Sequence, residues 1–264
     1  MSKKILLGLS LVFAAALTLS AQTNFVYNFD PTDSDAWSDG DSLNSGSGIL
    51  AQSSWLIDDT NGDGTGDLHA FSDGNGGTAG YQKAVFFTPV TETFDVGETI
   101  TLDTTLALAN FGALTGEKGV FRVGLRNAYT NGTPLVGVDY FVSQQYASKL
   151  GSVTGSTTSA RTALTRTDGS FHDLSVSITK SATANTFDVT TSFDGVASTS
   201  YTLENSTLYS ATTVHAAIDM RASHQTGGLW LDSFSSTVVP ESSAFASIFG
   251  LMALACVVSR RKRD

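Results

Sequence analysis

Apolar and polar residues alternate along most of the chain between residue 22 and residue 238. A period of two is typical of strands that bury one face. No stretch of this region has the spacing of apolar positions that a helix needs to bury one side. The alternation predicts strands at 25–29, 100–108, 121–125, 174–178, 187–193 and 214–220.

Glycine-containing dipeptides separate these strands and predict tight turns. Asn131-Gly132, Asp168-Gly169 and Asp194-Gly195 each favour the positive φ angles of a short turn. Asp194-Gly195 lies between two alternating segments, 187–193 and 197–203, so we expect a β-hairpin there. About a dozen short strands within one domain predict an all-β, two-sheet sandwich or jelly roll.

Both ends of the chain break this pattern. Lys3 and Lys4 precede an apolar run at 5–19, and the small residues Ser20 and Ala21 follow it. This order predicts a secretory signal peptide over 1–21. We therefore expect a signal helix at the N-terminus and a body, 22–238, that is exported.

The C-terminal segment 239–264 predicts a membrane anchor. Val239, Pro240 and Glu241 precede an apolar run at 244–258, and a basic stop of Arg260, Arg261, Lys262 and Arg263 follows. The run is near the lower length limit for a transmembrane helix. Basic residues favour the cytoplasmic side, which leaves the body on the opposite side of the membrane.

This tail resembles the PEP-CTERM sorting signal of Gram-negative bacteria, with a Val-Pro-Glu-Pro motif, a short transmembrane helix and an arginine-rich end. Ser242 stands where the family has its second proline. The resemblance implies an exosortase-type processing protease as partner and an intermediate inserted in the inner membrane. Cleavage near the motif would then release the protein to the cell surface or the extracellular matrix, often in organisms that make exopolysaccharide.

The charge balance of the body, residues 22–238, excludes some classes of binding partner. The whole chain has a net charge of −10, and residues 22–238 hold 9 Lys and Arg against 23 Asp and Glu. Such a surface repels nucleic acid and anionic lipid. The one cysteine, Cys256, lies in the apolar tail, so the body has no disulfide and relies on its core.

The strand and turn chemistry of the second half resembles the concanavalin A-like and laminin-G-like jelly rolls. The resemblance lies in 171–174, the Phe-Asp-Gly turn at 193–195 and the closing strand 229–234. It implies a two-sheet sandwich of that kind, and an immunoglobulin-like sandwich stays open as the alternative.

One acidic loop is a candidate calcium site. Oxygen-bearing side chains alternate with other residues at Asp59, Asn61, Asp63 and Asp67, and glycines permit a tight wrap. The spacing resembles the start of an EF-hand-type loop, but Ala70 stands where a closing carboxylate belongs. A calcium loop and an empty, solvated loop both remain open.

Required catalytic patterns are absent from the sequence. No pair of glutamates shares a strand as retaining glycosidases on the concanavalin-like fold require, and neither Gly-x-Ser-x-Gly nor His-Glu-x-x-His occurs. We assign no catalytic residue and expect no enzyme activity. A polysaccharide-degrading glycosidase or lyase remains the alternative, because residues distant in sequence can meet in space.

A polar stripe is the candidate binding face. Along 214–221 the apolar residues alternate with His215, Asp219 and Arg221, and Arg122 and Arg126 alternate likewise on another strand. These five are candidates to bind exopolysaccharide or another glycan, and ordinary solvent exposure is the alternative. Trp37, Trp55 and Trp230 are candidates for sugar stacking or for the core.

Overall fold

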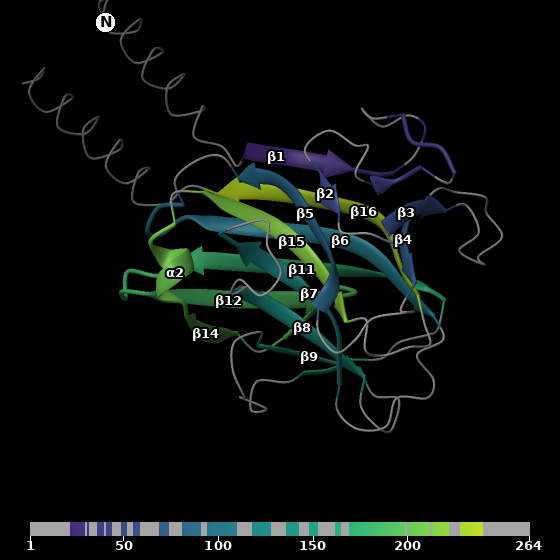
Figure 1. The fold of residues 1–264 in the computed structure, drawn as a ribbon. Coiled ribbons are helices and arrows are strands. Elements are labelled where there is room, and N and C mark those ends of the chain that lie inside the picture. The colour runs from purple at the N-terminus through teal and green to yellow at the C-terminus, as the bar shows by residue number, and fades with distance from the viewer. Residues whose placement is uncertain are drawn as a thin grey trace, which may run out of the picture.

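The computed structural model describes the body of the chain in segments. The described residues are 22–29, 31, 36–39, 41–43, 49–51, 55–58, 69–73, 81–90, 94–109, 118–127, 136–142, 148–152, 162–164, 169–198, 200–211, 213–221 and 228–239. Among them the fold is a sandwich of two antiparallel sheets, and Figure 1 shows one sheet lying in front of the other.

The front sheet in Figure 1 has seven strands in the order β10-β9-β8-β7-β15-β5-β2. Its members are β2 (Leu50–Ala51), β5 (Tyr81–Val90), β7 (Lys118–Arg126), β8 (Val136–Val142), β9 (Ser148–Ser152), β10 (Thr162–Leu164) and β15 (Val214–Arg221).

The sheet behind it has nine strands, with the main order β13-β12-β11-β6-β16-β4-β3. In addition β1 pairs with β16, and β14 pairs with β12. Its members are β1 (Gln22–Tyr27), β3 (Trp55–Asp58), β4 (His69–Asp73), β6 (Thr99–Ala109), β11 (Phe171–Lys180), β12 (Thr186–Phe193), β13 (Val196–Ala197), β14 (Tyr201–Glu204) and β16 (Gly228–Val239).

The core lies between the two sheets and uses one side of the strands whose side chains the structure describes. Every second residue points inward, so the apolar residues of the alternating pattern meet in a single buried cluster. Inward side chains of the nine-stranded sheet include Ile100, Leu102, Leu106, Leu174, Val176, Ile178, Phe187 and Phe234; those of the seven-stranded sheet include Phe121, Val123, Leu125, Val136, Val138, Tyr140 and Ile218. This confirms the all-β, two-sheet fold that the sequence predicts.

The predicted strands and the predicted hairpin are confirmed. Each of the six predicted segments coincides with or overlaps a strand. Asp194 and Gly195 both have positive φ, 48° and 74°, and join Phe193 to its register partner Val196. The returning strand is divided into β13 and β14, and both pair with β12.

One short helix was not predicted. α2 (Ser206–Tyr209) follows β14, and Asn205 caps it by accepting a hydrogen bond from the backbone N–H of Leu208 at 2.9 Å. Four residues are too few to display a helical stripe of apolar positions.

The first and last strands of the body lie side by side. β1 pairs with β16 from Gln22 opposite Val238 to Tyr27 opposite Phe234. On its other edge β16 pairs with β6 along its length, ending with Val239 opposite Thr99. The final strand is therefore an interior strand of the nine-stranded sheet. No helix among these described segments is long and apolar enough to span a bilayer; the predicted signal and transmembrane helices lie outside the described residues.

Candidate binding site on the seven-stranded sheet

Charged residues gather on the outer face of the seven-stranded sheet. Arg122 of β7 is the register partner of Asp139 on β8 and of Asp219 on β15. The three form one row across three strands, with the arginine in the middle. Four residues along β7, at Arg126, the register partner on β15 is His215, which is likewise four positions from Asp219.

Two ion pairs connect these side chains. Arg122 donates from Nε to Asp139 Oδ1 and from a terminal nitrogen to Asp139 Oδ2 at 3.3 Å. Arg126 donates to Asp219 Oδ2. Each arginine thus pairs with one aspartate, and the four formal charges balance.

A row of small residues makes room for the second pair. Between the two charged rows lie Gly137, Gly124 and Ala217, which are register partners across β8, β7 and β15. Because Arg126 reaches an aspartate four residues beyond its register partner, its side chain extends along the sheet. Larger residues in the intervening row would block that path.

The strands beneath this row approach closely at Gly137. A Cβ atom built on Gly137 would overlap the carbonyl oxygen of Val123 and lie 2.6 Å from the Cα atom of Gly124. Real Cβ atoms do not approach backbone atoms this closely. Glycine at this position is therefore a requirement of the packing between β7 and β8.

Most of the cluster is shielded from solvent. Asp219 is fully buried, Arg126 is 2% exposed and His215 is 5% exposed, whereas Arg122 is 18% exposed. Simple solvent exposure of the polar stripe is therefore wrong for Asp219, Arg126 and His215. Arg122 is the member of the cluster that solvent or a ligand reaches.

Burial also sets the protonation behaviour of Asp219. It raises the pKa of this carboxyl above its ordinary value, because the charged form loses hydration. The charge of Arg126, its hydrogen bond and the charge of Arg122 lower the pKa in opposition. The arginines thus offset only part of the rise that burial causes.

A tyrosine from the opposite sheet reaches the same region from the interior. Tyr201 of β14 donates from its hydroxyl to the carbonyl oxygen of Gly137 at 3.0 Å. Burial, and then the negative charge of Asp139, raise the pKa of Tyr201. The hydrogen bond ties the two sheets together directly behind the charged cluster.

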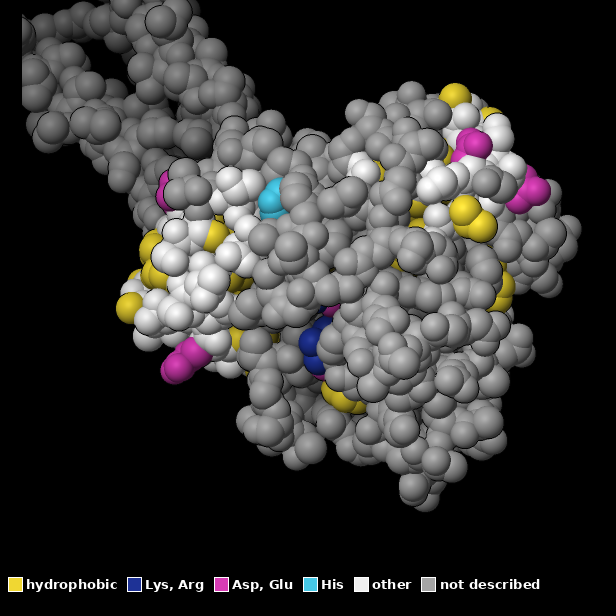
Figure 2. Space-filling model, viewed as in Figure 1, with side chains coloured by type: hydrophobic (Ala, Val, Ile, Leu, Met, Phe, Trp, Pro, Cys, Tyr) yellow, Lys and Arg dark blue, Asp and Glu magenta, His cyan; other side chains and the backbone are white. Residues whose placement is uncertain are grey.

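Figure 2 shows Lys and Arg side chains, with Asp or Glu side chains next to them, on the near face of the molecule in front of the seven-stranded sheet. Among the side chains that the structure describes on that sheet, the arginines are Arg122 and Arg126. The partly exposed Arg122 and the charged side chains around it define the candidate site.

The other predicted residues fall into two groups. Arg221 is the last residue of β15 and the register partner of Tyr81, so it lies on the same strand as His215 and Asp219. Its side chain is not among those that the structure describes. The three tryptophans, Trp37, Trp55 and Trp230, are 2%, 1% and 9% exposed. Their burial supports the core alternative over sugar stacking.

Several predicted sites lie outside the described residues. The candidate calcium ligands Asp59, Asn61, Asp63 and Asp67 belong to the segment that joins Asp58 of β3 to its register partner His69 of β4. Pro240, Glu241 and the basic residues 260–263 are likewise not described. Val239, the first residue of the predicted sorting motif, is the last residue of β16. Within the described ranges no group of three or more His, Cys, Asp or Glu is placed to hold a metal ion.

Sequence reasoning missed Asp139. It lies in the segment Val136-Gly137-Val138-Asp139-Tyr140, where a single charge interrupts apolar and small residues. An isolated charge in such a strand is expensive to bury without a partner. The interruption was a usable signal that an oppositely charged side chain lies on a neighbouring strand.

The fold resembles that of the concanavalin A-like two-sheet jelly rolls. No protein-family model matches the sequence, and no curated protein does. Among solved structures, a peanut lectin with a bound nonapeptide is similar at TM-score 0.51 and 11% identity, covering 83% of this chain and 97% of the lectin. A carbohydrate esterase from the Shiga toxin-encoding bacteriophage phi24B is similar at TM-score 0.54 and 15% identity, covering 84% of this chain and 100% of the esterase. At these identities the likeness is one of fold.

Proposed function

We propose that this chain is an exported cell-surface or extracellular-matrix protein that binds carbohydrate, without catalysis, through the outer face of its seven-stranded sheet. The observation that carries the proposal is the balanced Arg122, Asp139, Arg126 and Asp219 cluster on that face, in which Arg122 stays partly exposed. A small number of fixed polar groups is what orients a ligand and gives specificity. The fold, which a lectin shares, supports the same class of ligand.

The ion pairs also argue against a catalytic role for these aspartates. A glycosidase needs one carboxyl as a proton donor and a second as a base or nucleophile. Asp139 and Asp219 are each held by an ion pair to an arginine. This arrangement suits fixed hydrogen-bond acceptors better than an acid and base pair.

A glycan array on the purified chain, paired with an assay for released reducing ends, tests the proposal. We expect binding to one or more glycans and no release, with and without added calcium. Loss of binding on chelation would support the predicted calcium loop at 59–67. Release of reducing ends would instead support the alternative of a polysaccharide-degrading enzyme and overturn the non-catalytic assignment.

Replacing Arg122 with lysine should weaken glycan binding about tenfold, equivalent to about 1.4 kcal/mol. Lysine keeps the positive charge but loses the planar fork that holds Asp139 through two hydrogen bonds. Affinity electrophoresis against the glycan identified on the array measures the effect. Arg126→Lys is the matched control: since Arg126 is buried, it should lower thermal stability more than affinity. Equal affinity in the Arg122 variant and the wild type would contradict the proposed site.

Export and sorting form the second part of the proposal. Neutral replacements of Arg260, Arg261, Lys262 and Arg263 should reduce membrane retention or processing, because these residues hold the predicted helix end at the cytoplasmic surface. Cell fractionation and the mass of the mature protein measure this. Neutral replacement of Lys149, Arg161 and Arg166 in the body is the control. Normal localisation and trimming of the tail variant would overturn the sorting assignment.

A further inference from the structure

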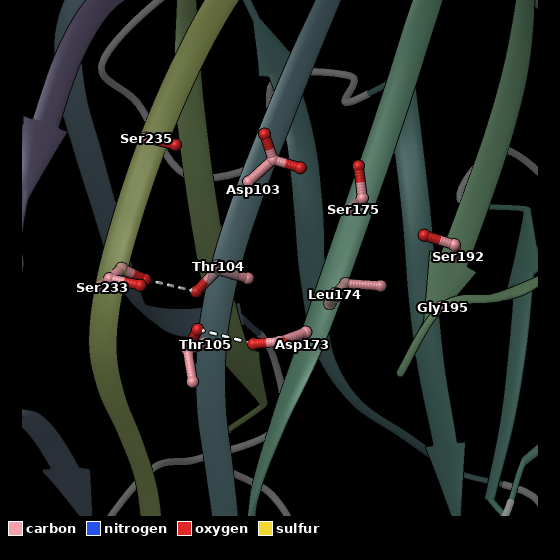
Figure 3. Close-up of a pocket in the computed structure, with 10 residues that line it drawn as sticks. All are labelled: Asp103, Thr104, Thr105, Asp173, Leu174, Ser175, Ser192, Gly195, Ser233 and Ser235. Atoms are coloured by element: carbon pink, nitrogen blue, oxygen red, sulfur yellow. Dashed lines mark hydrogen bonds between the residues drawn. The ribbon is translucent and has the colours of Figure 1, made fainter.

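The outer face of the nine-stranded sheet, opposite the site above, carries a shallow groove. Its volume is about 230 Å³, and it crosses β16, β6, β11 and β12 (Figure 3). The lining residues are Asp103, Thr104, Thr105, Asp173, Leu174, Ser175, Ser192, Gly195, Ser233 and Ser235. Hydroxyls and two carboxylates thus provide most of the lining side chains.

Four of these side chains form one row across the sheet. Ser235 is the register partner of Asp103, Asp103 of Ser175, and Ser175 of Ser192. Figure 3 shows the four side by side on consecutive strands. With a spacing of about 4.8 Å between strands, the row spans roughly 14 Å.

Neighbouring rows on the same two strands close on themselves. Between β6 and β11 the hydroxyls of Thr99 and Thr179 lie 2.7 Å apart, and Thr101 lies 3.0 Å from Ser177. On the other side of the groove's central row, Thr105 donates to Asp173 at 2.8 Å. These rows satisfy their hydrogen bonds within the sheet.

The row in the groove does not satisfy its side-chain hydrogen bonds within the sheet. Among the described residues, no side-chain hydrogen bond joins Asp103 to Ser175, and the side chains of Ser192 and Ser235 have none either. One carboxylate and three hydroxyls therefore direct their hydrogen-bonding capacity out of the protein. The break in the paired pattern coincides with the groove.

The chemistry of the row selects a polyhydroxyl ligand. The row holds a single carboxylate, Asp103, which is far short of the six to eight oxygen ligands that calcium takes. Asp103 and Asp173 repel anions. The groove is smaller than the roughly 300 Å³ and above of enclosed ligand pockets. An extended neutral polysaccharide lying across the strands meets all three conditions.

We infer that this groove is a second carbohydrate site, and that the protein cross-links neutral polysaccharide chains through its two opposite faces. The inference rests on the proposed carbohydrate-binding function and extends it. Two sites on one sandwich hold two separate chains, because the core lies between the faces. A single molecule then forms a junction in a polysaccharide network.

Turbidity and affinity electrophoresis of the full chain in detergent, with dextran, laminarin and galactomannan as neutral probes and alginate as an anionic probe, test the inference. The wild type should raise the turbidity of at least one neutral probe and not of alginate. The double variant Ser175→Ala and Ser192→Ala should lose this turbidity but keep the binding due to the Arg122 face. In an Arg122→Lys background, the double replacement should weaken the remaining binding at least fivefold.

Thr101→Ala is the matched control, because it removes a hydroxyl one row outside the groove; it should change neither measurement. Unchanged turbidity in the double variant overturns the second site. If Arg122→Lys alone still weakens glycan binding, the proposed function stands. If the double variant lost all binding and Arg122→Lys lost none, the groove would remain a binding site. Cross-linking, and the proposed site around Arg122, would then be overturned. Failure of the wild type to bind any neutral probe overturns both.

Discussion

Replacing Gly137 with alanine should lower the free energy of unfolding by about 3 kcal/mol, the upper end of the usual cost of overpacking. The new methyl group would overlap the Val123 carbonyl and lie 2.6 Å from the Gly124 Cα. Neither is a flexible side chain that can move aside. The hydrogen bond from Tyr201 to the Gly137 carbonyl would be disturbed as well. Chemical denaturation monitored by circular dichroism measures the change.

Gly169→Ala is the matched control. Gly169 has a φ of 76°, but a Cβ there meets nothing within 4 Å. Gly169→Ala should lower the free energy of unfolding only by the cost of placing alanine in the left-handed region, about 1–2 kcal/mol. If Gly137→Ala were no more destabilising than Gly169→Ala, β7 and β8 would not approach closely enough at Gly137 to exclude a Cβ atom.

Replacing Asp219 with alanine should destabilise the fold by about 3–5 kcal/mol, because it leaves the buried Arg126 guanidinium without the carboxylate that balances its charge. The same loss should weaken the positioning of Arg122, whose register partner is Asp219. Thermal and denaturant unfolding at neutral pH measure the effect.

The double variant Arg126→Met and Asp219→Leu separates the charge effect from packing. Replacing both charges with apolar residues of similar size removes the uncompensated charge, so it should recover most of the stability that Asp219→Ala loses. A double variant as unstable as Asp219→Ala would show that the ion pair itself does not explain the loss.

Strand alternation made much of the fold predictable from sequence. The segments at 100–108, 174–178 and 187–193 are strands because each places an apolar residue inward at every second position, and this pattern is local. The turn at Asp194-Gly195 was predictable for the same reason, since its φ angles depend on two residues. Strand order was not predictable, because pairs such as β6 with β16 join segments more than a hundred residues apart.

The candidate sites were predictable only in part. Alternation predicted that Arg122, Arg126, His215 and Asp219 lie on the outer faces of their strands. It did not predict that three of them are buried. Burial depends on what covers a face, and that is a property of the whole fold. The groove row was harder still, because Asp103, Ser175, Ser192 and Ser235 come from four strands and resemble any exposed serine or aspartate until the register aligns them.

The position of the last strand limits how far the sandwich can stand from any membrane that its tail enters. Val239 is still paired with Thr99 inside the sheet, and the apolar run begins at residue 244. The four residues between them span at most about 14 Å when fully extended. Because β1 begins opposite Val238, the predicted leader and the predicted anchor would join the sandwich at one corner. If the predicted anchor were inserted, that corner would lie against the headgroups.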